Sequence, residues 1–409
     1  MKICLVSQEY PPETPWGGIG TQTWNKARAL AELGHETHVL SRSAEEGADL
    51  RTELDHGVIV HRMKPPGYEF PIYNRATYLL GYSWFVLGKL AELMEQTNFD
   101  VLDFPEFGGE GFAYLLDRTT WNWVPVVVQL HGPLPMFIEY MGWPEKESRF
   151  AEVGTYLERF SVERADGLMA CSASVAKLAE RHYGVSAETI DVVHCGVDTA
   201  VFHPAGRPTA IERPTILFVG AIVENKGAKV LVEAALRLRK KYPDLLLRMI
   251  GKGGPDLMEQ IDAMIQAANA QDNVEFLGFV ALEKLPDYYR SAHLFCSPAA
   301  EFEGFGQVFL EAMACECPVI ASTAGGGAEA VTHGETGLLV EPNDVAATAA
   351  AMDRLLGDAD LRRRFGRQAR RRVEEYFAMP QFIRRVEAVY EKAIQRSQAS
   401  PQRYVDARE

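Results

Sequence analysis

Two acidic residues around a pair of glycines form the most informative motif of the chain. The segment 301–314 reads EFEGFGQVFLEAMA. Its glycines predict a helix that begins near Gly306, whose first backbone N–H groups are free to bind a diphosphate. Glu311 would then lie roughly 7 Å along the helix axis, where its carboxylate suits the two hydroxyls of a ribose. Glu303 precedes the helix and would face whatever lies beyond the phosphates.

Three other loops carry residues that could contact the same kind of ligand. The sequence WGGIG at 16–20 surrounds Gly18, and such glycines either let a backbone approach an anion or simply make a tight turn. His131 follows an apolar run within QLHGP, where it would hydrogen-bond a ligand or a neighbouring carbonyl. Lys226 lies in VENKG before a predicted helix, where it would hold a phosphate or remain a solvated surface lysine.

Several ligand classes are disfavoured by the same residues. A dinucleotide fingerprint fails, because Thr23 stands where its third glycine belongs. We expect no metal, since the only D-x-D, at 358–360, falls in a predicted helix-entry turn and the six cysteines lack metal-ligand spacing and read as buried free thiols. Nucleic acid is not expected as a partner, because the net charge is −14.

The elements that must position these residues alternate along the chain. Short β-branched runs are followed by longer amphipathic segments, which predicts parallel sheets covered by helices. The alternation restarts after the proline-rich segment 202–214, so we predict an α/β protein of two domains, with the boundary at 203/204. The predicted strands are 2–7, 36–40, 58–62, 100–103, 125–130, 167–170, 190–194, 215–219, 245–250, 274–277, 294–297, 318–321 and 337–340.

These motifs together resemble the retaining nucleotide-sugar glycosyltransferases of the GT-B fold, specifically glycosyltransferase family four (glycosyl transferases group 1). The likeness spans nearly the whole chain, in GGIG, DVLDFPE, QLHGP, GVDTAVFHP, VENKG, NVEFLGFV, EGFGQVFLEAMA and GGGAEAVTHGETGLLVEPND. It implies two Rossmann-like domains with parallel sheets facing across a cleft. The implied divisions are 1–203, 204–379 for nucleotide-sugar binding, a final helix at about 380–396 that packs back on the first domain, and a flexible tail at 397–409.

The resemblance also assigns roles by position. Glu311 would bind the ribose hydroxyls, Glu303 would contact the donor sugar near its reacting end, and Lys226 would neutralise the diphosphate. His131 would touch the donor sugar from the first domain. The remaining implied donor contacts are Gly18 at the diphosphate, Val280 beside the base, and Phe305, Gly306 and Gln307, whose backbone N–H groups would meet sugar and diphosphate.

The implied reaction is transfer of a sugar from a nucleoside diphosphate to an acceptor hydroxyl, in polysaccharide or glycoconjugate synthesis. The nucleotide sugar is then a substrate rather than a cofactor, no metal is required, and the acceptor is a sugar, glycolipid or polysaccharide. One departure is Ala221, where the family usually has a second diphosphate-binding arginine, and Lys252 is one candidate to replace it. Two alternatives therefore remain: a GT-B epimerase, and a nucleotide-sugar binding protein with weakened catalysis.

A cytoplasmic location is expected, since the N-terminus MKICLVSQEYPP lacks the apolar region of a signal peptide. The longest apolar stretch, 78–87, is far shorter than the roughly 20 residues of a spanning helix. We expect 78–90 to form a buried helix, with weak peripheral membrane contact as the alternative.

Overall fold

The computed structural model describes residues 1–14, 17–44, 50–64, 75–118, 123–206 and 212–399. Its contacts divide the chain into unit 1, Met1–His194 with Phe382–Glu409, and unit 2, Cys195–Gln381. The boundary thus lies at 194/195 rather than at the predicted 203/204. The reason is that residues just after 194 already pack on unit 2: the ring of Phe202 lies 6.1 Å from that of Tyr289, and the Phe202 carbonyl accepts a hydrogen bond from Arg370.

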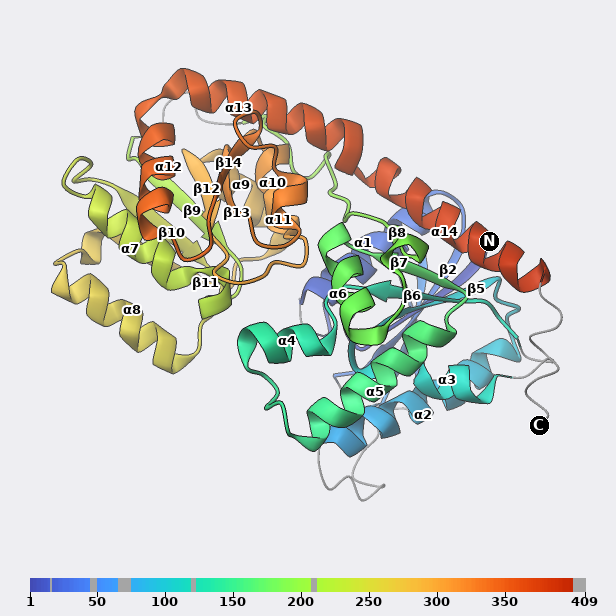
Figure 1. The fold of residues 1–409 in the computed structure, drawn as a ribbon. Helices are drawn as coiled ribbons and strands as arrows, with labels where there is room; N and C mark the ends of the chain where they lie inside the picture. Colours follow the sequence, from blue (N-terminus) through green and yellow to red (C-terminus); the bar gives the residue numbers. More distant parts are fainter. Residues whose placement is uncertain (15–16, 45–49, 65–74, 119–122, 207–211, 400–409) are drawn as a thin grey trace. The chain divides into compact units, whose positions relative to one another are not determined.

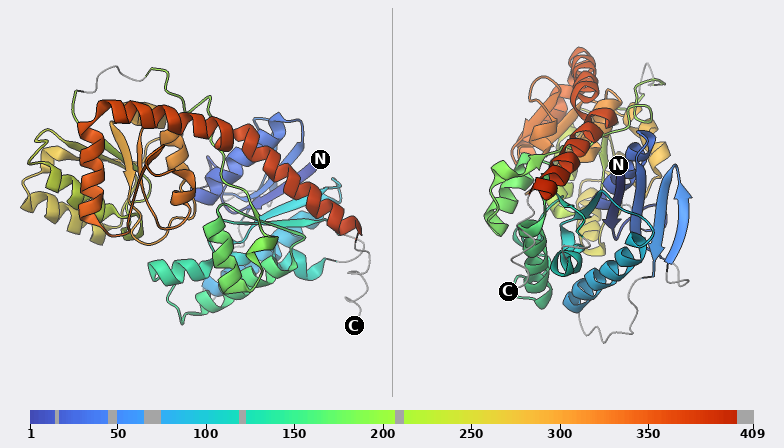
Figure 2. Two further views of the ribbon diagram at one scale, coloured as in Figure 1. Left: turned by 45° about the horizontal axis from the view of Figure 1, so that its top comes forward. Right: turned by 90° about the vertical axis from the view of Figure 1, so that its right-hand side faces the viewer.

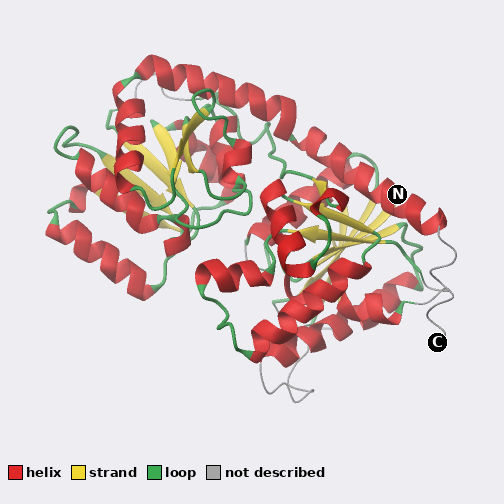
Figure 3. Ribbon diagram, viewed as in Figure 1, coloured by secondary structure: helices red, strands yellow, loops and turns green. Residues whose placement is uncertain are grey.

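The sheet of unit 1 has the order β3-β4-β2-β1-β5-β6-β7-β8 among the described residues, and helices flank its strands (Figure 1, Figure 3). All neighbouring strands are parallel except the β3–β4 pair, which is antiparallel. The strands are β1 (Lys2–Ser7), β2 (Glu36–Arg42), β3 (Leu50–Asp55), β4 (Val58–Met63), β5 (Val101–Pro105), β6 (Val126–Leu130), β7 (Gly167–Ala170) and β8 (Asp191–Val192). Strand order reverses between β1 and β5, the place where such sheets bind ligands.

The helices of unit 1 follow the predicted alternation. The predicted buried helix at 78–90 lies inside α2, whose inner face, at Tyr82 and Leu90, is buried. The helices are α1 (Gly18–Glu32), α2 (Arg75–Met94), the 3-10 turn η1 (Phe107–Gly109), α3 (Phe112–Asp117), α4 (Leu134–Met141), α5 (Arg149–Arg164), α6 (Ala173–Tyr183) and η2 (Ala187–Thr189). No helix of the described residues is long and apolar enough to cross a membrane.

Unit 2 contains an entirely parallel sheet of order β11-β10-β9-β12-β13-β14 in the part of the chain described. Numbered from β9, this is the doubly wound order 3-2-1-4-5-6, and the switch point lies between β9 and β12. In sheets of this order, ligands bind beside the loops that leave the carboxyl ends of the two strands at the switch point. The strands are β9 (Thr215–Val219), β10 (Leu246–Ile250), β11 (Val274–Gly278), β12 (Leu294–Ser297), β13 (Val319–Ser322) and β14 (Gly337–Val340).

The helices of unit 2 cover its sheet with an apolar core of branched and aromatic side chains that includes Phe218, Leu247 and Phe365. Asp358 caps α13, with its carboxylate accepting the Leu361 N–H at 2.8 Å, which confirms the cap predicted for the D-x-D. The helices are η3 (Glu224–Lys226), α7 (Ala228–Leu238), α8 (Pro255–Ala267), η4 (Gln271–Asn273), η5 (Leu282–Lys284), α9 (Leu285–Arg290), α10 (Gln307–Ala314), α11 (Gly327–Ala330), α12 (Val345–Gly357), α13 (Ala359–Arg372) and the π-helical turn η6 (Val373–Phe377).

The last helix, α14 (Met379–Ala399), is drawn in red in Figure 1 and Figure 2. From Phe382 onward it belongs to unit 1. The apolar side of α14 is buried and includes Tyr390. The Tyr390 hydroxyl donates a hydrogen bond to buried Asp103. Near the polar edge of α14, Lys392 forms an ion pair with Asp191 at 2.6 Å, and Glu387 is hydrogen-bonded to the His35 ring at 2.7 Å. The tail was predicted at 397–409, but residues 397–399 belong to α14, and 400–409 lie outside the described residues.

All six cysteines lie in the described part of the chain, where they are buried thiols that form no disulfide, as predicted from the apolar runs that contain them.

Candidate functional site

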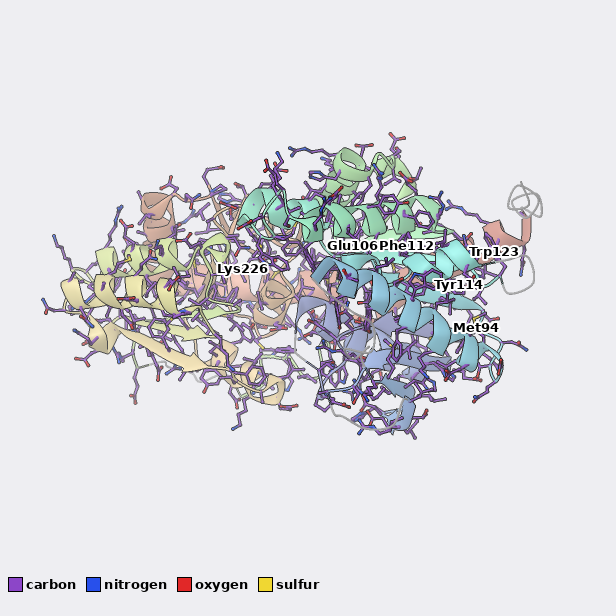
Figure 4. All side chains as sticks on the ribbon, turned by 90° about the horizontal axis from the view of Figure 1, so that it is seen from below. Met94, Glu106, Phe112, Tyr114, Trp123 and Lys226 are labelled. Atoms are coloured by element: carbon purple, nitrogen blue, oxygen red, sulfur yellow. The ribbon has the colours of Figure 1, made fainter. Side chains whose placement is uncertain are left out.

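Lys226 and Glu303 meet at the switch point of unit 2. Lys226 ends the 3-10 turn after β9, and Glu303 lies in the loop after β12; the Lys226 Nζ and a Glu303 carboxylate oxygen form an ion pair (Figure 4 labels Lys226). The Glu303 side chain is 9% exposed and that of Lys226 is 29% exposed. A nearly buried carboxylate thus faces an ammonium group that solvent or a ligand can still reach.

Gly227 explains why the chain turns so sharply after Lys226. Its φ is +73°, and a Cβ at this position would overlap the carbonyl oxygen of Pro298, which follows β12. The two loops are also joined by a hydrogen bond from the Ala300 N–H to the Asn225 carbonyl at 2.9 Å. A glycine is therefore needed to bring the lysine loop against the loop that carries Glu303.

The predicted helix begins at Gln307, one residue after Gly306, as α10. Gly306 has φ +81°, and a Cβ there would lie 2.5 Å from the ring of Phe309, so this position also requires glycine. Phe305 is buried, whereas Gln307 is half-buried at the first helical position. The first backbone N–H groups of such a helix lack intrahelical partners and carry the positive end of its dipole, which suits an anion.

Glu311 is buried inside α10, 5% exposed, and accepts a hydrogen bond from the Tyr289 hydroxyl at 2.8 Å. Burial raises the pKa of Glu311 to about 7. A carboxylate that costs this much to bury is rarely kept for packing alone, and it is available to accept further hydrogen bonds from a ligand.

The glycines at 325–327 follow β13. Gly325 lies against the backbone of Glu303, where a Cβ would overlap its carbonyl oxygen. The Gly326 N–H also donates to the Glu303 carbonyl at 2.7 Å. This glycine loop therefore fixes the Glu303 segment in place.

The backbone of Lys252 lies beside Ala221, the position at which the resemblance would place an arginine. The Ile222 N–H donates to the Lys252 carbonyl at 2.9 Å, and Gly251, with φ +139°, packs so closely on the Gly220 carbonyl that a Cβ would overlap it. The Lys252 side chain is exposed at this edge. Val280, half-exposed, follows β11, two strands from β9, and is the predicted residue farthest from this cluster in the sheet order.

In unit 1, Gly18 is the exposed first residue of α1, directly after β1 and its loop. The neighbouring Gly17 is pinned by Glu9: a Cβ at Gly17 would overlap the Glu9 carboxylate, which also accepts the Gly20 N–H at 3.1 Å. Burial raises the pKa of Glu9. The GGIG segment therefore starts a helix, and Gly18 is its exposed glycine.

His131 follows β6 at the same carboxyl edge of the sheet. Burial, with the nearby Lys26 ammonium as a smaller cause, lowers the pKa of His131 to about 3, so its imidazole is neutral at physiological pH. A neutral imidazole can donate one hydrogen bond and accept another but carries no charge. Its backbone N–H donates to Glu106 at 2.6 Å.

Sequence reasoning missed three residues that build these sites: Glu106, Tyr289 and Glu9. Glu106 stands in DVLDFPE at a predicted strand end, and the rule that selected His131 could have selected it as well. Tyr289 gave no signal, because its contact with Glu311 joins two helices that are separated along the chain.

The structure contains one cavity beside the Lys226 loop and another that is remote from the candidate site residues. One of about 220 Å³ in unit 2 borders the lysine loop and is lined by Glu224, Gly227, Lys229, Val230, Ala300, Glu301 and Asn343. The other, of about 510 Å³, lies in unit 1 at the amino end of β5, where Met94, Tyr114 and Trp123 gather away from Glu106 (Figure 4). Across the described ranges, no cluster of three or more His, Cys, Asp or Glu could hold a metal ion.

Two family models match the chain. Residues 16–201 match Glycosyltransferase Family 4, and residues 205–372 match Glycosyl transferases group 1. A D-inositol 3-phosphate glycosyltransferase from Pseudarthrobacter chlorophenolicus is 32% identical over 403 residues, covering 91% of each chain. A glycogen synthase from Mycobacterium tuberculosis is 29% identical over 416 residues, covering 98% of this chain and 97% of that protein.

Solved structures show the same fold at lower identity. Sucrose-phosphate synthase from Thermosynechococcus elongatus superposes with a TM-score of 0.80 at 23% identity, covering 96% of this chain and 99% of that one. Anabaena HepE in complex with UDP-glucose superposes with a TM-score of 0.74 at 19% identity, covering 96% and 99%. The transferase relatives support sugar transfer rather than the epimerase or binding-protein alternatives. The chain therefore belongs to the family 4, group 1 glycosyltransferases of the GT-B fold.

Proposed function

We propose that this protein transfers a sugar from a nucleoside-diphosphate sugar to an acceptor hydroxyl with retention at the anomeric carbon and without a metal ion. The observation that carries the proposal is the group formed by Lys226, Glu303 and the start of α10, with Glu311 behind it, at the switch point of unit 2. That HepE was solved with UDP-glucose supports a nucleotide sugar as donor.

The leaving diphosphate is the group that this arrangement stabilises best. As the glycosidic bond breaks, negative charge grows on the diphosphate. The ammonium of Lys226 and the backbone N–H groups of Gly306 and Gln307 therefore stabilise the transition state more than the bound donor in its ground state. The ion pair with Glu303 already holds the Lys226 ammonium in position before the donor binds. When the donor binds, the ammonium donates hydrogen bonds to both the Glu303 carboxylate and the phosphate.

The other site residues take roles set by their chemistry. Glu311 accepts hydrogen bonds from the ribose hydroxyls, since it is a buried carboxylate five positions beyond Gly306. Glu303 accepts from hydroxyls of the donor sugar. His131, neutral because its pKa is about 3, makes hydrogen bonds to the sugar and carries no charge to it.

Retention and metal independence follow from the resemblance of the motifs. In the retaining mechanism that it implies, the acceptor attacks from the side on which the diphosphate departs, and the leaving phosphate takes the acceptor proton. The phosphate charge is then met by Lys226 and the helix dipole, in the role that a divalent cation has in metal-dependent transferases.

Lys252 supplies the second phosphate cation in place of the missing arginine at 221. This assignment is supported by the hydrogen bond that holds its backbone to Ile222, next to Ala221, and by its exposed side chain. The acceptor is a polyol or sugar hydroxyl, a class supported by the names of the inositol-phosphate and glycogen-forming relatives.

Proton NMR of the anomeric signals during turnover tests this function. The protein is incubated with UDP-, GDP- and ADP-glucose and with UDP-N-acetylglucosamine, using D-inositol 3-phosphate and maltooligosaccharides as acceptors, with and without EDTA. We expect one donor to give an α-linked product at the same rate in EDTA. A β-linked product would contradict retention, a rate abolished by EDTA would contradict metal independence, and interconversion of the donor alone would favour an epimerase.

A further inference from the structure

Two buried glutamates, to which the proposed chemistry gives no role, hold the turn that carries His131. Glu106 accepts the backbone N–H groups of His131 at 2.6 Å and Gly132 at 2.5 Å on one carboxylate oxygen. Glu158 accepts the N–H of Leu134 at 2.8 Å. Both glutamates are 0% exposed. Three N–H groups of the four-residue turn 131–134, whose third residue is proline, therefore end on carboxylates.

Glu158 connects this turn to the loop after β5. Its other oxygen accepts the N–H of Gly108 at 2.9 Å, at a turn where Gly108 has φ +70°. The Tyr183 hydroxyl, from the end of α6, donates a further hydrogen bond to Glu158. The loops after β5 and β6 are thus fixed to α5 and α6 through one carboxylate. We call Glu106 and Glu158 together the carboxylate clamp.

The clamp is costly to bury. Burial raises the pKa of Glu106 to about 7 and that of Glu158 to about 8, and the negative charge of Glu106 adds to the shift of Glu158. The Tyr183 hydroxyl on α6 donates to Glu158, and the Glu106 carboxyl acts on Glu158 by its charge; the ammonium of Lys26 on α1 is near His131, whose backbone N–H Glu106 accepts. Two adjacent buried acids disfavour the folded state, so packing alone does not account for them at a ligand-binding sheet edge.

We propose that Glu106 and Glu158 are positioning residues that hold the backbone of the His131 turn where the imidazole meets the donor sugar. This inference rests on the proposed role of His131 in transfer. Carboxylates are stronger acceptors of N–H groups than neutral side chains, so the clamp fixes the turn more tightly than a Gln or Ser would. A small displacement of a contact to the reacting sugar has a large effect on rate.

The free oxygen of Glu106 makes the clamp sensitive to pH. Within the described residues, its Oε2 is buried without a hydrogen-bond partner, while Oε1 accepts both N–H groups. A proton taken up at Oε2 leaves Oε1 bonded but makes it a weaker acceptor. The turn is therefore held most firmly when the acid is ionised, and kcat is expected to rise with pH across the range in which the pair titrates, near 7 to 8.

The test compares Glu106→Gln with Glu110→Gln in the full chain. Glutamine keeps an acceptor oxygen but cannot ionise. Glu110 is a matched control: it is buried in the same unit, its pKa is raised by burial to about 8, and it accepts the Gln8 N–H at 3.2 Å instead of the His131 turn. Glu158→Gln is the second variant, with Leu134 as its reporter. Backbone amide exchange, donor turnover and nucleotide affinity are measured for each.

Glu106→Gln is expected to speed amide exchange at 131–132 about tenfold or more, to lower kcat by about 10- to 100-fold with nucleotide affinity kept within about twofold, and to flatten the pH dependence of kcat. Glu110→Gln should change none of these. Unchanged exchange at 131–132, or equal kcat losses in the two variants, would overturn the clamp. If wild type turns over no donor, the proposed function fails, and the exchange result still decides whether the clamp holds the turn.

Discussion

Replacing Glu311 by Gln should make the protein more stable but weaken its binding of nucleotide. Glu311 is buried with the Tyr289 hydroxyl at 2.8 Å, and burial raises its pKa to about 7 from the ordinary 4.5. In the unfolded chain this acid is ionised above pH 4.5. Above pH 7 the folded protein must therefore bury a charge, whereas glutamine can accept the same hydrogen bond from Tyr289 without one.

The size of the effect follows from the shift. The difference between about 7 and 4.5 is roughly 2.5 pKa units, and at 1.36 kcal/mol each this gives an upper limit of about 3 kcal/mol. Because the pKa is raised on folding, the free energy of unfolding is unaffected by Glu311 below about pH 4.5, where the acid is protonated in both states. The free energy of unfolding then falls as the pH rises from about 4.5 through about 7. Glu311→Gln should therefore unfold at higher urea than wild type at pH 8, by about 1–3 kcal/mol, and the difference should shrink below about 1 kcal/mol at pH 5.

Nucleotide binding should change in the opposite direction. A hydrogen bond from a ribose hydroxyl to a charged acceptor contributes about 1.5–3 kcal/mol, so affinity should fall about 10- to 150-fold. Urea unfolding at pH 5 and 8 and calorimetric titration with UDP, GDP and ADP measure the two effects, with the exposed Glu259→Gln on α8 as control. A variant that is less stable at pH 8, or that binds nucleotide as wild type does, would refute the reasoning.

Three further substitutions test the surrounding structure. Lys252→Ala should weaken diphosphate affinity about tenfold without lowering the melting temperature, and calorimetry showing unchanged affinity would remove Lys252 from the site. Tyr390→Phe leaves buried Asp103 without one donor and should cost about 1.5–3 kcal/mol in urea unfolding; a cost near zero would mean that this contact does not hold α14. Gly227→Ala places a Cβ on the Pro298 carbonyl at φ +73° and should cost at least about 1–2 kcal/mol and reduce donor affinity, whereas wild-type melting and affinity would contradict the tight loop contact.

The strands of this fold were largely readable because most of them are buried on both faces. The run Thr215–Val219 is buried throughout and apolar after its first residue, and its ends were predicted at the observed residues. β3 (Leu50–Asp55) was missed, since it is a largely exposed edge strand whose sequence, LRTELD, shows no apolar pattern. Its position depends on antiparallel pairing with β4, a tertiary contact that local sequence does not encode.

The candidate site was predicted in its residue types but not in its pairings. Glu303 and Lys226 were chosen separately from their loops, and only the doubly wound strand order brings β9 and β12 side by side so that the two side chains meet. Glycine permits close approach in general, so the sequence alone does not show what the glycines at 325–327 contact. That Gly325 approaches the Glu303 backbone is set by long-range packing.

The central claim is that unit 2 binds a nucleoside diphosphate through Lys226 and Glu311. Thermal unfolding of wild type, Lys226→Met, Glu311→Gln and Glu259→Gln, each with UDP, GDP and ADP at about 1 mM, tests it most directly. We predict that one nucleotide raises the melting temperature of wild type and Glu259→Gln but of neither site variant. No shift with any nucleotide, or the same shift in all four proteins, would contradict the claim.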